Sequence, residues 1–295
     1  MLTSAGVRLG VLILPEHRWS TAAPIWRRVE DLGFDHAWTF DHIAWRELRD
    51  EPWFASIPTL TAAALATSTL RLGTLVASPN FRHPVPFARE LLTLDDISGG
   101  RLTVGLGAGG IGWDATILDQ EAWSPKERTD RFTEFVTLLD RVLREPEVTA
   151  TGRYYGADGA RSYPGCVQRP RVPLAIAAIG PRGMRLAADH AEIWVSNGDR
   201  TSNTPTVAAT EGAEMIRRQM VALDLACETA ERDPTSLRRL VLLGGQLAAG
   251  TESRAAFQET KGAYAEVGVT DLVVPWPRPS EPFAGDPAVL EHLID

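Results

Sequence analysis

Leu9-Gly10-Val11-Leu12-Ile13-Leu14 and His36-Ala37-Trp38-Thr39-Phe40 are the two stretches that decide the fold. Each is a short and largely apolar run, typical of a strand that is buried on both faces of a parallel sheet. Between them Ile25, Val29 and Leu32 recur at i, i+4 and i+7, which predicts an amphipathic helix. The three segments together predict a strand–helix–strand unit.

The same alternation continues to the end of the chain. Further strands are predicted at 71–78, 102–106, 173–178, 192–196, 239–244 and 270–275. Further helices are predicted at 59–67, 87–94, 132–143, 182–190, 206–231 and 252–267. Eight strands, each followed by a helix, favour an α/β fold of the (β/α)8 TIM-barrel type, formed by one domain over residues 1–295.

Local signals set the limits of some elements. Ser20 and Thr21 can cap the first helix, and Gly33 can end it. Glycines and prolines interrupt the rhythm over residues 149–171. They predict an insertion between strands four and five, folded as a small hairpin plus a loop.

Composition narrows the class of protein. The 295 residues carry a net charge of −8 and no basic stripe, so we expect no nucleic-acid partner. The two cysteines, Cys166 and Cys227, have no metal-ligand spacing, and no metal site is expected. The sequence contains no run of about 18 apolar residues, so we expect no membrane span. The first residues lack the pattern of a secretion signal, so none is expected. We therefore expect a reduced, cytoplasmic protein.

Polar residues follow several predicted strands. Asp41 and His42 come directly after the second strand, where a barrel enzyme carries its catalytic groups. The alternative is that the two residues only orient each other within a loop. His17 follows the first strand and Asn80 the third, while Trp45 begins an aromatic loop that also contains Trp53 and Phe54. That loop is interpreted either as a mobile lid over an aromatic ligand or as a surface loop.

Two glycine-containing turns could bind a ligand. Gly107, Ala108 and Gly109 follow the fourth strand and allow a flat ring to approach the backbone, although an ordinary tight turn has the same composition. The segment from Ile179 through Gly180 and Arg182 to Gly183 follows the fifth strand and begins a helix, whose free N–H groups suit a phosphate. An ordinary strand-to-helix turn is the alternative there as well.

The chain resembles the bacterial luciferase-like monooxygenase superfamily, and within it the coenzyme F420-dependent oxidoreductases. The resemblance runs in unbroken order from about residue 7 to residue 200. It rests on the motifs at 32–38, Asp41-His42, 72–76, 81–84, 94–102, 105–109, 167–170 and 180–188. Each motif alone is weak evidence for the family, and their order along the chain is what makes the resemblance specific.

The resemblance implies a deazaflavin or flavin at the C-terminal mouth of the barrel. Asp41 would bond to the edge of the ring, and His42 would act beside the hydride-transfer centre. A non-proline cis peptide is implied near Leu75 and Val76, behind the ring. Gly107, Ala108 and Gly109 would line the ring, and residues 179–183 would take the phosphate.

One departure concerns the substrate. Sugar-phosphate dehydrogenases of this family have a glutamate after the strand-four glycines, where this chain has Gly110, and the nearest acid is Asp114 beside Trp113. We expect Trp113, Asp114, His17 and Trp45 to shape the substrate pocket.

Three functions stay open. The first is an F420-dependent oxidoreductase that transfers a hydride between the deazaflavin and a small organic substrate. The second is an FMN-dependent monooxygenase that uses reduced flavin and O2, and the third is a barrel that binds the cofactor without turnover. Relatives often dimerise through barrel helices, so a homodimer is a further expectation.

Overall fold

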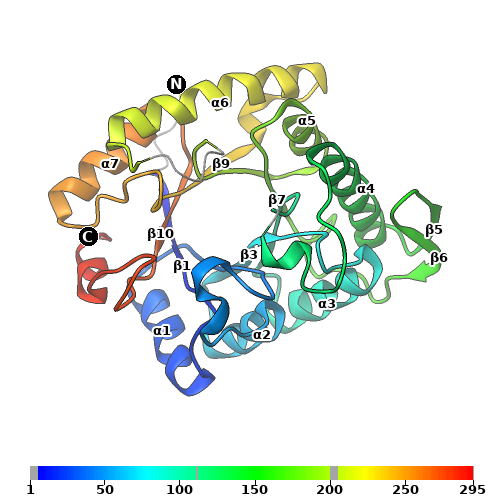
Figure 1. Cartoon of the computed structure of the whole chain (residues 1–295), viewed down its shortest axis with the longest axis horizontal. Helices are drawn as coiled ribbons and strands as arrows, with labels where there is room; N and C mark the ends of the chain where they lie inside the picture. Colours follow the sequence, from blue (N-terminus) through cyan, green and yellow to red (C-terminus); the bar gives the residue numbers. More distant parts are fainter. Residues whose placement is uncertain (1–5, 111, 200–204, 295) are drawn as a thin grey trace.

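The structure is a computed structural model that describes residues 6–110, 112–199 and 205–294. Eight parallel strands close into a barrel in the order β1-β10-β9-β8-β7-β4-β3-β2, with helices around it (Figure 1). The barrel strands are β1 (Arg8–Leu12), β2 (His36–Thr39), β3 (Arg71–Ala77), β4 (Leu102–Leu106), β7 (Leu174–Ala177), β8 (Ile193–Ser196), β9 (Arg238–Leu242) and β10 (Asp271–Pro275). The TIM barrel expected from the alternation of elements is confirmed.

Seven α-helices form the outer layer of the described chain. They are α1 (Trp19–Asp31), α2 (Ser56–Ala66), α3 (Pro84–Ile97), α4 (Pro125–Arg144), α5 (Pro181–His190), α6 (Ala209–Thr229) and α7 (Arg254–Glu266). Short 3-10 helices lie at η1 (Arg46–Asp50), η2 (Trp113–Ala115), η3 (Pro234–Ser236) and η4 (Pro287–His292). The last strand is therefore followed by a 3-10 helix and not by the α-helix that a strict eight-fold alternation predicts.

The predicted cap of the first helix is wrong. Helix α1 begins at Trp19 after the extended residue Arg18, and no side chain caps it. Ser20 and Thr21 lie inside its first turn, where the N–H of Thr21 donates to the carbonyl of Arg18 at 2.8 Å. The chain thus turns into the helix earlier than the hydroxyl residues indicate.

The core has two apolar layers because successive strand residues point to opposite faces. Val11 belongs to the layer between strands and helices, with Val104 and Phe135. Its neighbour Leu12 belongs to the layer inside the barrel, with Leu240. This inner layer fills the barrel below the mouth, so a ligand is expected where the strands end.

The barrel's opposite end is closed by a buried carboxylate. Asp271 starts β10, is fully buried and accepts hydrogen bonds from Arg8, Arg238 and His36. Burial disfavours its charge, but the bonds from His36 and Arg238 outweigh burial and hold the pKa of Asp271 well below its usual range. The N-terminal end of the barrel is therefore fastened by an ionic cluster.

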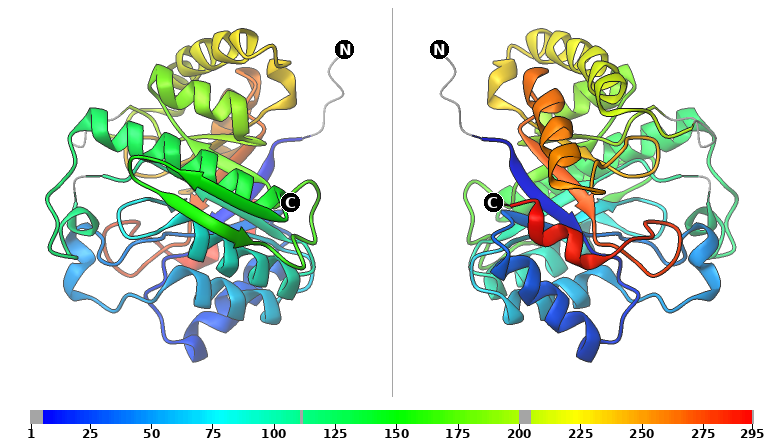
Figure 2. Two further views of the ribbon diagram at one scale, coloured as in Figure 1. Left: turned by 90° about the vertical axis from the view of Figure 1, so that its right-hand side faces the viewer. Right: turned by 90° about the vertical axis from the view of Figure 1, so that its left-hand side faces the viewer.

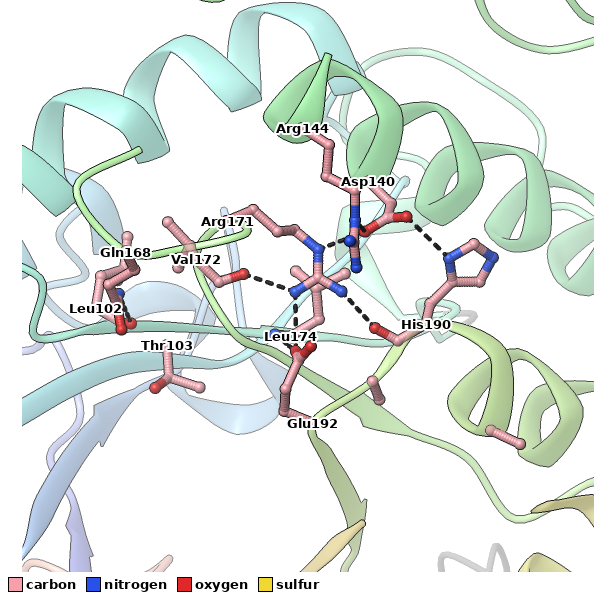
Figure 3. Close-up of polar contacts among 12 residues, drawn as sticks. Leu102, Thr103, Asp140, Arg144, Gln168, Arg171, Val172, Leu174, His190 and Glu192 are labelled. Carbon is pink, nitrogen blue, oxygen red and sulfur yellow. Dashed lines mark hydrogen bonds and ion pairs between the residues drawn. The ribbon is translucent and has the colours of Figure 1, made fainter. Parts of the chain in front are cut away.

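The predicted insertion is an antiparallel hairpin, β5 (Glu147–Thr151) with β6 (Gly156–Arg161), which lies outside α4 (Figure 2, left). Arg171, the last residue of the predicted insertion, is fully buried and donates to Asp140 of α4, to Glu192 at 2.8 Å and to the carbonyl of His190 at 2.6 Å (Figure 3). Burial raises the pKa of Asp140, but bonds from His190 and the nearby arginines outweigh it and hold that pKa well below normal. The insertion is thereby fixed to α4 and α5.

Among the described helices, none has both the length and the apolar character that crossing a bilayer requires.

Candidate active site

A cavity of about 900 Å³ opens at the C-terminal ends of the strands. Loops after β2, β3 and β4 contribute to its wall, together with residues of β7, β8 and β9. Its lining includes these predicted site residues: His42, Trp45, Leu75, Val76, Asn80, Gly107, Ala108, Gly109, Trp113 and Asp114. The structure therefore brings together at one mouth residues that the sequence spreads over 73 positions.

His42 and Asp114 form a hydrogen-bonded pair in this wall. His42 Nδ1 contacts Asp114 Oδ2, and the other carboxylate oxygen accepts the backbone N–H groups of Ile43 at 2.8 Å and Ala44 at 3.2 Å. The Asp114 side chain is 6% exposed and the His42 side chain 30% exposed. An ionised carboxylate can only accept, so Nδ1 is the protonated nitrogen of this pair, and in the neutral imidazole Nε2 is then an acceptor.

Asp41 does not line the cavity. Its carboxylate accepts from Arg82 Nε at 2.6 Å and from Arg82 Nη2 at 2.8 Å, and Ser56 Oγ donates to it as well. The pair is buried, with Asp41 3% and Arg82 12% exposed. Burial lowers the pKa of Arg82, but the bonds and charges of Asp41 and Glu90 outweigh it and raise that pKa overall. Asp41 therefore fastens the loop that carries His42, and its two oxygens are already occupied by the protein.

Aromatic rings form one side of the mouth. The ring of Trp45 lies 4.8 Å from Phe40, 6.0 Å from Trp53 and 6.2 Å from Phe283, measured between centroids. Trp53 Nε1 donates to the carbonyl of His42 at 2.8 Å. These contacts fold the aromatic loop back onto the barrel mouth, where it supports the histidine.

Another part of the wall comes from the end of β3 and from the loops after β3 and β4. A side chain at Gly107 would place its Cβ 2.5 Å from Val76 Cγ2, and one at Gly109, whose φ is +75°, would lie 2.6 Å from Asn80 Oδ1. The Leu75–Val76 peptide is cis, at the place that the resemblance indicates. Glycines here leave a backbone surface that a flat ring can approach.

A second cavity of about 440 Å³ adjoins the first, and both are lined by Ala108, Gly109 and Arg128. Ile179, Gly180, Arg182 and Gly183 line it at the start of α5. Gly180 precedes that helix with no side-chain cap, so the first turn presents N–H groups and the positive end of the dipole. Arg182 is paired with Asp130, and Arg128 is a second cation in the lining, so these guanidinium groups and the backbone N–H groups together favour an anion there.

His17 lies apart from the other predicted site residues. It does not line the main cavity, and its Nε2 is 3.9 Å from Glu16, which is bound by Arg278. Trp113 is 43% exposed at the rim, with the guanidinium of Arg49 3.8 Å from its ring centroid. No group of metal-binding side chains is found in residues 6–110, 112–199 and 205–294.

Several residues that shape the site were missed. Arg82 and Ser56 hold Asp41, and Phe283 closes the aromatic side, yet none lies at the end of a nearby strand. Only Arg82 carried a signal, because it stands within the motif Phe81-Arg82-His83-Pro84 of the resemblance. The ring of Phe283 comes from a loop near the C-terminus, and no sequence pattern indicated it.

Comparison with known proteins identifies the family of this chain. The family model described as luciferase-like monooxygenase matches residues 3–267. An F420-dependent glucose-6-phosphate dehydrogenase of Beutenbergia cavernae is 36% identical over 221 residues, which cover 72% of this chain and 64% of the relative. A 5,10-methylenetetrahydromethanopterin reductase of Methanopyrus kandleri is 26% identical over 241 residues, which cover 76% of this chain and 66% of the relative. The chain thus spans slightly less than two thirds of these relatives' lengths.

A solved structure gives the fold independently. An F420-dependent secondary alcohol dehydrogenase, in complex with an F420-acetone adduct, superposes with a TM-score of 0.79. The match covers 98% of this chain and 97% of that one, at 17% identity. At that identity the likeness establishes a shared barrel fold.

Proposed function

The chain belongs to the luciferase-like monooxygenase family, and on that premise we propose that it is an F420-dependent oxidoreductase. It transfers a hydride between the deazaflavin and a small organic substrate at the C-terminal mouth of the barrel. The observation that carries the proposal is the joined pair of cavities, one beside His42 and one at the start of α5. A ligand that has a flat ring and a phosphate needs both.

The residues fit such a ligand. Gly107, Gly109 and Val76 offer a flat wall for the ring, and the uncapped start of α5 offers N–H groups for the phosphate. F420, when bound, supplies the carbon that exchanges a hydride with the substrate. His42, with Nε2 as an acceptor, takes up the proton that an alcohol substrate releases and returns it in the reverse direction. The relatives named as F420-dependent favour the deazaflavin over FMN.

The cavity wall favours a substrate with an apolar body. Phe40, Trp45, Leu75 and Leu242 lie on the side of the cavity that His42 shares. Arg46, which also lines this cavity, already lies over the ring of Trp45 at 5.2 Å. Together with Gly110 in place of the family's glutamate, this wall makes a sugar phosphate a poor match.

Turnover under anaerobic conditions tests the proposal. The protein is mixed with F420 and a panel of primary and secondary alcohols and of glucose 6-phosphate, and loss of the visible absorbance of oxidised F420 is recorded. We expect reduction with an apolar alcohol, loss of that rate in His42→Ala, and a retained rate in the control Asp119→Asn, an exposed residue of the strand-four loop. Oxygen consumption with reduced FMN, without F420 reduction by any alcohol, would instead identify a monooxygenase.

A further inference from the structure

Three hydrogen bonds fix the carboxylate of Asp114 beside His42. Asp114 comes from the loop after β4 and His42 from the loop after β2, so the contact joins two separate strand exits. The backbone N–H groups of Ile43 and Ala44 hold Oδ1 of Asp114 at 2.8 and 3.2 Å, which turns Oδ2 toward the imidazole. The carboxylate is therefore fixed in orientation before any ligand binds.

We propose that Asp114 is a positioning residue, which keeps His42 in the Nδ1–H tautomer with the Nε2 lone pair available to the substrate. This inference rests on the proposed function, since it assigns the substrate class of that same site: an alcohol, or its carbonyl product in the reverse direction. Asp114 acts through its hydrogen bond to His42 Nδ1.

The chemical step balances with these groups. The substrate C–H bond breaks and its hydrogen leaves as a hydride to oxidised F420, which is reduced. The O–H proton passes to Nε2 of His42, and the electron pair left on oxygen forms the carbonyl bond. The imidazolium produced is stabilised by the Asp114 carboxylate at Nδ1, in the way that a buried carboxylate supports a histidine base in acyl-transfer enzymes.

A purely structural role for Asp114 is the alternative. Its bonds to Ile43 and Ala44 would also order the loop if the tautomer of His42 were irrelevant to the reaction. Asp114→Asn separates the two roles. The amide oxygen replaces Oδ1 toward the backbone N–H groups, and the amide NH2 replaces Oδ2, so His42 must accept at Nδ1 and carry its proton on Nε2.

The test uses the ligand-free protein first. Imidazole 15N shifts of His42 are recorded over a pH series for the wild type, Asp114→Asn and the control Asp119→Asn. We expect the neutral Nδ1–H tautomer in the wild type and the control, and the Nε2–H tautomer in Asp114→Asn. An Nε2–H tautomer in the wild type, or the same tautomer in all three proteins, would overturn the inference.

Kinetics completes the test. With F420 and the alcohol found in the panel, kcat of Asp114→Asn should fall on the order of 10²-fold, the range for loss of a positioned base. The dissociation constant of F420 and the KM for the alcohol should stay within about twofold, because the loop bonds are kept. A changed tautomer with unchanged kcat would refute the positioning role. Failure of F420 to bind the wild type would instead refute the proposed function, while the tautomer measurement would still decide the role of Asp114.

Discussion

Replacing Asp41 with alanine should destabilise the protein, because this residue is a buried partner of Arg82 and not a free ligand-binding group. The Asp41 side chain is 3% exposed and that of Arg82 12%, and the two make a bidentate pair with Nε–Oδ2 at 2.6 Å and Nη2–Oδ1 at 2.8 Å. Removing the carboxylate leaves the guanidinium buried with one remaining acidic partner, Glu90, which is 48% exposed.

The expected loss in the free energy of unfolding follows from that geometry. Breaking a buried pair by removing one partner costs about 3–5 kcal/mol. Because Glu90 still contacts Arg82 at 2.8 Å, the lower end, about 3 kcal/mol, is expected. For a chain of this length, about 2 °C is lost per kcal/mol, so the melting temperature should fall by about 6 °C.

A double-mutant cycle of Asp41→Ala and Arg82→Met measures the pair directly by chemical denaturation. The double variant should be less destabilised than the sum of the two single variants, with a coupling of about 2 kcal/mol. Lys126→Ala, which breaks an exposed pair with Asp130, serves as the control and should cost under about 1 kcal/mol. Additive losses, or an Asp41→Ala protein as stable as the control but unable to bind F420, would refute the reasoning.

Three further outcomes are expected. Tyr264→Phe should raise the free energy of unfolding by about 1 kcal/mol, because the buried Tyr264 hydroxyl has no hydrogen-bond partner in the described chain; a destabilised variant in urea denaturation would contradict this. Gly107→Ala should weaken F420 binding at least tenfold in a fluorescence titration, because the added Cβ would press on Val76 in the wall of the cavity. The control Gly262→Ala in α7, whose added Cβ would have no atom within 4 Å, should bind F420 normally. The stability that Asp271 contributes is present above the ordinary carboxyl pKa of about 3.9 and is lost as pH falls through the lower pKa of the folded state. Asp271→Asn should therefore be less stable than the wild type at pH 7 and should lose less stability on acidification, as measured by urea denaturation over a pH series. Parallel pH curves for the two proteins would count against this role of Asp271.

The sequence predicted the barrel well because each of its strands is a dense apolar run with few alternatives. Strand β3, for example, was expected at 71–78 and lies at Arg71–Ala77. The start of α2 was placed three residues late, at Thr59 in place of Ser56, because Ser56 follows no capping pattern and its hydroxyl instead donates to Asp41. The start of α4 was recognisable but missed: Ser124 and Glu127 form a capping box.

The sequence indicated many of the residues that line the cavity, but not their partners. The resemblance implied His42 beside the hydride-transfer centre, and Asp114, the nearest acid to the family's missing glutamate, was expected in the substrate pocket. That they would bond to each other could not be predicted, because a contact across 72 positions depends on the relative orientation of two loops. The same limit applies to Asp41, which was expected at the ring and contacts Arg82 instead. Local patterns carry strand and helix propensity, whereas such pairings arise only when the closed barrel sets the loops side by side.

Binding of F420 against FMN tests the central claim most directly. Purified protein is titrated with each cofactor separately, and quenching of tryptophan fluorescence is followed, since Trp45 and Trp113 line the cavity. The account predicts tight binding of F420, weaker binding of FMN, and loss of F420 affinity in Gly107→Ala. Preference for FMN would contradict the deazaflavin assignment, and binding of neither cofactor would contradict the assignment of the two joined cavities as a cofactor site.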